Sequence, residues 1–440
     1  MLPLSNHKKI FRLAVPIILA NASAPLLGLA DTATIGQTGN AADLGAIALA
    51  TLVFSFVYWG FGFLRMGTTG FIAQADGAQD RDEVISVLFR SGLLGLGIGL
   101  LLILLQFFIG NFSVWLMSSS DEVKNLVKDY FYIRIWGAPA TLITYALLGG
   151  FIGLGWTKQL LWVQLLLNGL NIFLNVLFVV GFDMGIQGIA VGTVIAEWVA
   201  LFYAWQLIVK KLEIENPMER AKELWQQIIN RAKMIAIFKV NADIMIRTFA
   251  LLSGFAWFAN QGAKFGDTTL AANHVLLQFV SLSAFFLDGF AHVSEMLSGK
   301  MIGAKDKPGF LKQLKETTQL AGFSAIILGG TVILFAPCVI GFITKEVDVQ
   351  VIAQQHAIYA GVYILLSFVA FQLDGVFIGA TRSKEMRNAS LISLFILVAV
   401  GTILTQQFGN VGLWISFIIY VVVRGVSLGL YMPKLLPKLF

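Results

Sequence analysis

The chain carries the stretch FIGLGWTK at residues 151–158 and returns to it as FIGATRSK at residues 377–384, 226 positions later. Two further matches keep this spacing: GAQD (77–80) with GAKD (303–306), and Phe182 with Phe408. Each match lies at the end of a long apolar run. Three matches at one spacing indicate two structurally equivalent halves.

The composition places these halves in a lipid bilayer. Apolar residues make up 57% of the chain, charged residues only 13%, and the mean hydropathy is +0.79, which excludes an ordinary water-soluble surface. A helix needs about 20 apolar residues to cross a hydrocarbon core of roughly 30 Å. Such stretches occur at residues 10–36, 46–73, 84–110, 127–153, 158–181, 186–209, 233–261, 268–300, 313–343, 350–380, 386–407 and 411–433. The sequence therefore predicts an all-α polytopic membrane protein with twelve transmembrane helices.

The spans divide into two six-helix lobes, residues 1–210 and 232–440, joined by a polar linker at 211–231. Because each lobe has six spans, both begin on the same side of the membrane. The lobes are therefore expected to be related by a pseudo-two-fold axis along the membrane normal. In the linker, Asn216 before Pro217 predicts a capped amphipathic helix at the inner surface.

Basic residues set the orientation. Lysine and arginine number 22 in the termini and even-numbered loops, against four in the other loops. Both termini are therefore predicted to be cytoplasmic. The net charge of +6 then reflects topology and requires no nucleic-acid partner. A single cysteine, Cys338, excludes an internal disulfide framework.

Charges inside the spans are the first candidates for function, because an ionised group at membrane depth is costly. The embedded acids are Asp31, Glu197, Asp243, Asp288, Glu295 and Asp374, and the embedded bases are Arg65, Arg134, Lys239, Arg247 and Arg424. The near balance favours structural ion pairs for many of them. Asp243 and Arg247, four residues apart on one helix, are expected to pair directly.

A polar cluster is predicted within the first lobe. Asp31, Asn175 and Thr193 lie about five, six and seven residues from the outer ends of their spans, so their depths agree within one helical turn. Asn171 lies one turn below Asn175 on the same face. Such oxygen ligands suit a small hard cation, with Na⁺ bound at these four residues, and a lone buried aspartate suits a proton. The alternative is a cluster that only joins helices through hydrogen bonds.

The first span also carries Pro16 and Pro25, each of which removes a backbone hydrogen bond and can bend the helix. A bendable helix that bears a titratable acid is a plausible switch.

The second lobe has a polar stripe of its own. Asp288, His292 and Glu295 follow i, i+4, i+7 spacing and share one helix face, while Asp374 lies in the inner part of span 10. This face is suited to cationic substrates or protons if it lines a cavity, and it is structural if it faces Arg247 or Arg424.

Several stretches closely resemble the DinF branch of the multidrug and toxic compound extrusion (MATE) transporters. They are LDGFA (287–291) with Glu295, LDGVFIGATR (373–382), EMRN (385–388), and Arg424 with Gly425. The resemblance implies two six-helix lobes around a central cleft. It also implies efflux of amphipathic, often cationic, compounds in exchange for inward H⁺ or Na⁺, with alternating access and no cofactor. We further expect a monomer in the inner membrane of a bacterium.

The resemblance also implies roles for single residues. The family's span-1 aspartate matches Asp31, its first-lobe cation cluster matches Asn171 and Thr193, and the span-10 acid of other MATE branches matches Asp374. Asn175 departs from the pattern, because this position is often aspartate in the branch. A dehydrated Na⁺ would lose an anionic ligand there, whereas a proton needs only Asp31, so the sequence favours proton coupling.

Other classes of protein fit less well. A flippase or exporter of lipid-linked or metabolite substrates would share the repeated halves, but a pyrophosphate substrate calls for a strongly cationic cleft, and the embedded charges here are mixed. No HExxH motif and no Walker lysine loop occurs in the sequence, so an enzyme or an ATP-driven pump is not expected.

Overall fold

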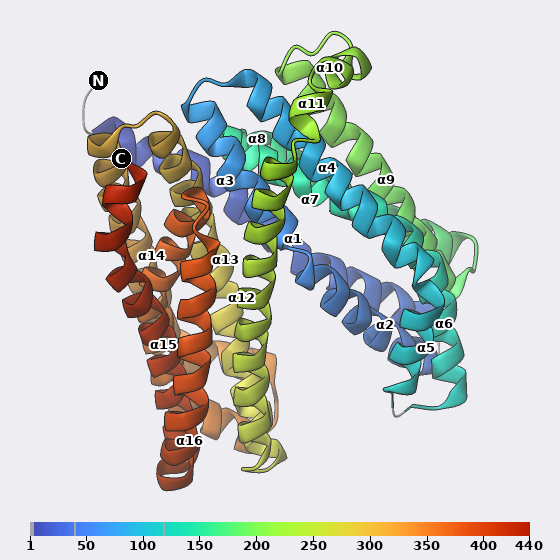
Figure 1. Ribbon diagram of the computed structural model, residues 1–440. Helices are drawn as coiled ribbons and strands as arrows, with labels where there is room; N and C mark the ends of the chain where they lie inside the picture. Colours follow the sequence, from blue (N-terminus) through green and yellow to red (C-terminus); the bar gives the residue numbers. More distant parts are fainter. Residues whose placement is uncertain (1–3, 39–40, 118) are drawn as a thin grey trace. The chain divides into compact units, whose positions relative to one another are not determined.

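The computed structural model describes residues 4–38, 41–117 and 119–440, and helices account for nearly all of them. In this part of the chain no β-strand occurs, and nine helical segments are long and apolar enough to cross a membrane. The predicted all-helical polytopic fold is confirmed (Figure 1).

The first six predicted spans coincide with helices, and spans 2 to 5 each contain a break or an irregular turn. The elements are α1 (Leu4–Thr38), α2 (Ala41–Gly60), α3 (Phe63–Gly77), α4 (Arg81–Leu104), α5 (Gln106–Trp115), α6 (Asp121–Arg134), η1 (Ile135–Gly137), α7 (Ala138–Leu154), α8 (Thr157–Val176), η2 (Leu177–Gly181) and α9 (Gly185–Lys211). Span 2 breaks between α2 and α3, and span 4 carries the single 3₁₀ turn η1 between α6 and α7. Breaks of this kind inside a membrane helix are tolerated where the protein buries the non-helical backbone.

The remaining elements are α10 (Pro217–Glu223), α11 (Trp225–Ile228), α12 (Arg231–Ala263), α13 (Asp267–Gly303), α14 (Lys307–Ile343), α15 (Val347–Gly379) and α16 (Ser383–Leu439). The last of these covers two predicted spans. Gly409 divides it with φ 59° and ψ −136°, a conformation that favours glycine and falls between the spans predicted at 386–407 and 411–433.

The internal repeat is visible in the backbone. Left-handed residues recur 226 positions apart, namely Gln79 with Lys305, Gly155 with Thr381, and Asp183 with Gly409. In the first of these turns, Asp80 and Asp306 each accept a hydrogen bond of 2.9 Å from the backbone N–H three residues later and so cap the following helix. The GAxD match in the sequence therefore encodes one turn, used twice.

A close helix crossing is repeated as well. The pairs are Gly149 and Gly153 of α7 against the backbone at Arg65 and Thr69 of α3, and Gly375 and Gly379 of α15 against the backbone at Ala291 and Glu295 of α13. A Cβ atom at any of these glycines would overlap its neighbour. Small residues four apart let membrane helices approach closely, so the glycines of the repeated motif set the helix packing of both halves.

The contacts within the described chain group it into two compact units. One contains the chain up to Ile18, Ala73–Gln79 and Lys239–Phe440, and the other contains Leu19–Ile72 and Asp80–Phe238. The division passes through α1, between Pro16 and Pro25. The lobe limits drawn at 1–210 and 232–440 stay a prediction.

Each unit has its own packing. In the unit that holds the C-terminus, α15 packs against α13, α14 and α16 (Figure 1). Its core is aromatic, with the rings of Tyr363 and Phe417 stacked at 4.6 Å and Trp414 and Phe258 fully buried beside them. In the other unit, α4 packs against α7, α8 against α9, and α6 against both α2 and α9.

The linker forms two short helices, α10 and α11, rather than one. Asn216 occupies the N-cap position of α10 and Pro217 its first turn, as predicted, but the side chain of Asn216 makes no capping hydrogen bond. The buried Arg90 of α4 holds α11 by donating to the carbonyls of Ile228 and Gln227 at 3.1 and 2.8 Å. The linker is therefore fastened to its own unit by charge-assisted hydrogen bonds.

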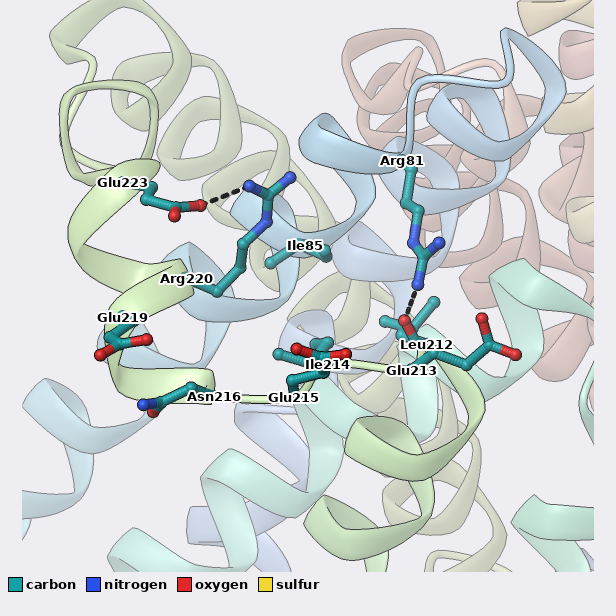
Figure 2. A pocket seen from close by; sticks show the side chains of 10 residues that line it. All are labelled: Arg81, Ile85, Leu212, Glu213, Ile214, Glu215, Asn216, Glu219, Arg220 and Glu223. Carbon is teal, nitrogen blue, oxygen red and sulfur yellow. Dashed lines mark hydrogen bonds and ion pairs between the residues drawn. The ribbon is translucent and has the colours of Figure 1, made fainter.

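A cavity of about 350 Å³ lies between α10 and the start of α4 (Figure 2). Arg81 donates to the carbonyl of Leu212 on one side, and Arg220 pairs with Glu223 at 2.5 Å on the other. Arg220 also contacts Asp82. These contacts hold the linker in place.

Candidate functional site

Asp31, near the end of α1, is the centre of the first candidate site. Its Oδ1 accepts a hydrogen bond of 2.7 Å from the side-chain amide of Asn175 on α8. The same amide donates to Asn171 Oδ1, also at 2.7 Å. Asn171 and Asn175 are each 1% exposed, whereas Asp31 is partly exposed. The structure thus places a partly exposed carboxylate against two buried side-chain amides, those of Asn171 and Asn175, which together form an amide platform.

A third asparagine of α8, Asn168, extends this platform and was not predicted from the sequence. Asn168 donates to the hydroxyl of Ser23 on α1 at 2.7 Å. Asn168, Asn171 and Asn175 follow i, i+3, i+7 spacing and therefore share one helix face. Two hydrogen bonds from this face, at Ser23 and Asp31, hold the second part of α1. The asparagine spacing was the pattern from which Asn168 could have been identified.

Helix α9 closes the platform from the other side. A Cβ atom at Gly192 would overlap Asn175 Oδ1, so only glycine leaves room for that amide. The neighbouring Thr193 is buried, and its hydroxyl donates to its own helix at the carbonyl of Ile189, 2.7 Å away. The hydrogen-bonded group therefore contains Asp31, Asn171 and Asn175, while the hydroxyl hydrogen of Thr193 is already engaged.

Two polar atoms of the platform have no hydrogen-bond partner among the described residues. They are Asn171 Nδ2 and Asn175 Oδ1, and both are buried. A buried donor or acceptor without a partner is costly, so water is expected at either atom, and a cation only at the oxygen. Asp31 is the acid of this platform, and no group of three His, Cys, Asp or Glu side chains suited to a metal ion occurs in the described chain. A Na⁺ here would therefore have mostly neutral ligands.

The prolines of α1 do not interrupt its helical assignment. The helix is continuous from Leu4 to Thr38, with Pro16 buried and Pro25 exposed. Each proline still removes one backbone hydrogen bond, so this helix has two weak points on the approach to Asp31.

The internal repeat provides a comparison for the Asp31 site. The positions 226 residues after Asp31 and Asn175 are Trp257 and Gly401. These two residues also meet, because a Cβ at Gly401 would abut the ring of Trp257. The same helix contact is thus built from an acid and an amide in one half and from apolar groups in the other. The fold by itself does not require a carboxylate at this contact.

The second candidate site contains a buried ion-pair cluster. Asp374 Oδ2 pairs with Arg247 and lies 3.9 Å from the guanidinium of Arg424. All three residues are at least 92% buried. Of the two alternatives left by the sequence, Asp374 thus faces arginines.

Two residues of the stripe interact with each other. His292 Nδ1 lies 3.1 Å from Glu295 Oε2, and Glu295 is fully buried beside the close contact of α13 with α15. The structure therefore separates a histidine–glutamate pair from the acid–arginine cluster of Asp374.

The expected pair of Asp243 with Arg247 is wrong. Asp243 pairs with Arg387 at 2.7 Å and accepts from Ser383, while Arg247 turns to Asp374. Spacing along one helix made the pair geometrically allowed, but each residue has its partner on another helix, Arg387 on α16 and Asp374 on α15.

A second ion pair, between Arg134 and Glu197, was not predicted from the sequence. The two form a doubly hydrogen-bonded ion pair at 2.7 and 2.8 Å, buried within the same unit as Asp31. Both had been noted as embedded charges, but their separation of 63 residues gave no local spacing from which to join them.

The sequence matches a family model and curated proteins over most of its length. A family model described as MatE matches residues 16–177 and 245–404. DNA damage-inducible protein F of Escherichia coli K12 is 33% identical over 429 residues, covering 96% of this chain and 91% of that protein. Multidrug resistance protein NorM of Vibrio cholerae is 24% identical over 433 residues, covering 96% and 93%.

Solved structures share the fold. The Vibrio cholerae MATE transporter VcmN in its bent form superposes with a TM-score of 0.88 at 19% identity, covering 99% of this chain and 98% of the other. A MOP superfamily transporter from Pyrococcus furiosus gives 0.85 at 19% identity, covering 99% and 96%. With two matched segments that cover most of both halves, the chain belongs to the MatE family of multi-pass membrane transporters, the MATE proteins, and is not an enzyme.

Proposed function

We propose that this protein is a multidrug efflux antiporter that exports amphipathic, often cationic, compounds in exchange for inward H⁺, with Asp31 as the coupling carboxylate. The curated relatives named for multidrug resistance support the substrate class. The basic loops support a bacterial cytoplasmic membrane with both termini inside. The protein acts as a monomer in this proposal.

One observation carries the coupling role. Asp31 and Asn175 form a 2.7 Å hydrogen bond where the other half of the repeat packs Trp257 against Gly401. A carboxylate inside a membrane span is retained at a cost, and here the equivalent contact is made without one. A role beyond helix packing accounts for its presence.

The geometry gives the carboxylate a way to act on α1. Ionised Asp31 accepts from Asn175 and holds the end of α1 to α8. A proton on Asp31 removes the charge and weakens this charge-assisted bond. Helix α1 can then bend at Pro16 or Pro25. The protein thus has two states, with α1 held to α8 or bent, and protonation shifts the equilibrium between them during alternating access.

The single carboxylate favours H⁺ over Na⁺. A dehydrated Na⁺ needs several oxygen ligands, and Asn171, Asn175 and Thr193 offer only neutral ones beside Asp31. We keep Na⁺ as the alternative coupling ion at these four residues.

Within the second polar site, Asp374 is proposed to join helices through Arg247 and Arg424. Asp288, His292 and Glu295 are proposed to serve substrate or proton movement in the other unit. The alternative of a lipid-linked flippase fits less well. Arg134, Arg247 and Arg387 are each paired with a carboxylate, which leaves their charge unavailable to a pyrophosphate.

The test is transport in proteoliposomes loaded with an amphipathic fluorescent cation such as ethidium, with pH and Na⁺ gradients imposed separately. Release driven by the pH gradient alone is the expected result. Release that follows neither gradient would contradict antiport, and release driven only by Na⁺ would reassign the coupling ion.

A further inference from the structure

The ion pair of Arg134 and Glu197 has no part in the proposed cycle, yet it is among the most buried charges of its unit. Arg134 Nη2 lies 2.7 Å from Glu197 Oε1, and Nη1 donates to Oε2 at 2.8 Å. The two side chains are 10% and 6% exposed. Buried pairs of this kind contribute little net stability, and inside a membrane span they indicate function by default.

The residues around the pair leave space for the carboxylate and place aromatic rings beside the guanidinium. Helix α6 ends at Arg134, and the turn η1 follows directly. A Cβ at Gly137 in that turn would overlap Glu197 Oε2, so glycine leaves room for the carboxylate. The rings of Phe54 and Tyr58 lie 5.1 and 5.3 Å from the guanidinium carbon, at cation–π distance.

The pair lies next to the Asp31 site along α9. Glu197 is one turn after Thr193 on this helix. The preceding Gly192 abuts the side chain of Asn175, which donates to Asp31. Two carboxylates and one guanidinium leave a formal charge of −1 when Asp31 is ionised. Any single monovalent cation is then enough for neutrality, so discrimination between H⁺ and Na⁺ depends on how many anionic ligands remain for a metal ion.

We propose that the guanidinium of Arg134 acts as a permanent counter-cation to Glu197. It thereby makes the neighbouring Asp31 site selective for H⁺ over Na⁺. The proposal rests on the proposed proton coupling. By neutralising Glu197, Arg134 removes one of the two anionic ligands that could draw in a hard cation. Without the guanidinium, the site would carry two carboxylates beside the neutral oxygens of Asn171 and Asn175.

The test is the thermal unfolding of purified protein in NaCl and in choline chloride at equal ionic strength. Arg134→Gln makes the formal charge of the site more negative, from −1 to −2. We therefore expect Na⁺, but not choline, to raise the Tm of this variant, because a ligand that binds only the folded state stabilises it. Wild type and Arg134→Lys, which keeps the charge, should show no Na⁺-specific shift. The matched control Arg134→Gln with Asp31→Asn returns to −1 and should lose the shift.

A folded Arg134→Gln variant with equal Tm in both salts would overturn the proposal. If that variant does not fold, Glu197→Gln provides the second test. It leaves Arg134 to neutralise Asp31, so pH-driven efflux should be lost, and Arg134→Gln added to it should restore efflux. Efflux at the wild-type rate in Glu197→Gln would equally overturn the proposal. The thermal measurement needs no transport, so its failure is distinguishable from a failure of proton-driven efflux in the wild type.

Discussion

Asn175 donates its side-chain amide to Asp31 at 2.7 Å and thereby joins α8 to α1. The same amide donates to Asn171, so both of its hydrogens are used and its orientation is fixed. The charge on Asp31 therefore affects how firmly α1 is held to α8.

Asp31→Asn should reduce pH-driven efflux to the rate of protein-free liposomes, because the amide keeps the shape of the side chain and removes its charge. The variant should express and unfold like the wild type. Asp183→Asn is a matched control, since Asp183 is exposed in a turn with φ 54°, a conformation that asparagine tolerates. Drug resistance at the wild-type level in cells with equal amounts of Asp31→Asn would refute the coupling role.

Asn175→Asp should introduce Na⁺ dependence. It places a second carboxylate beside Asp31, and the repulsion between the two is relieved when a cation binds between them. Efflux measured with and without Na⁺ at several pH values is the readout. Asn168→Asp adds the same charge on the same helix, at a position bonded to Ser23, and should not acquire the Na⁺ effect. Equal behaviour of the two variants would identify Asn175 as scaffold.

Gly192→Ala should displace the amide of Asn175, because the added methyl overlaps Oδ1 and the amide has no free rotation. We expect a loss of about 1–3 kcal/mol in stability, as in other overpacked sites, with weakened coupling. Gly169→Ala on α8 is the control, since a Cβ there meets no atom within 4 Å and alanine favours a helix by up to about 1 kcal/mol. Thermal unfolding and efflux would be measured for both, and an unaffected Gly192→Ala would mean that α8 and α9 have room to separate.

Asp374→Asn should destabilise the unit that holds the C-terminus by about 3–5 kcal/mol, because it leaves Arg247 and Arg424 without their shared carboxylate. Arg247→Gln added to it should recover part of the loss in thermal unfolding. A variant that unfolds normally but loses efflux would instead assign Asp374 to transport.

The sequence by itself determined the class of protein and its repeat. Hydropathy and glycine placement are local properties, and a bilayer leaves helices as almost the only way to satisfy the backbone. The 226-residue spacing therefore predicted two equivalent halves, and in the structure turns and helix crossings recur at this spacing, including the capping acids Asp80 and Asp306. The grouping of Asp31 with Asn171 and Asn175 could also be predicted, because their depths along straight helices are readable from residue counts.

The choice of partner was decided only by the tertiary structure. Arg247 lies four residues from Asp243 but pairs with Asp374, and Arg134 pairs with Glu197 across 63 positions. A charged side chain inside a membrane takes the nearest counter-charge in three dimensions, because water is not there to compensate an unpaired one. Which helices lie within reach depends on their packing, and that packing is not a local property of the chain.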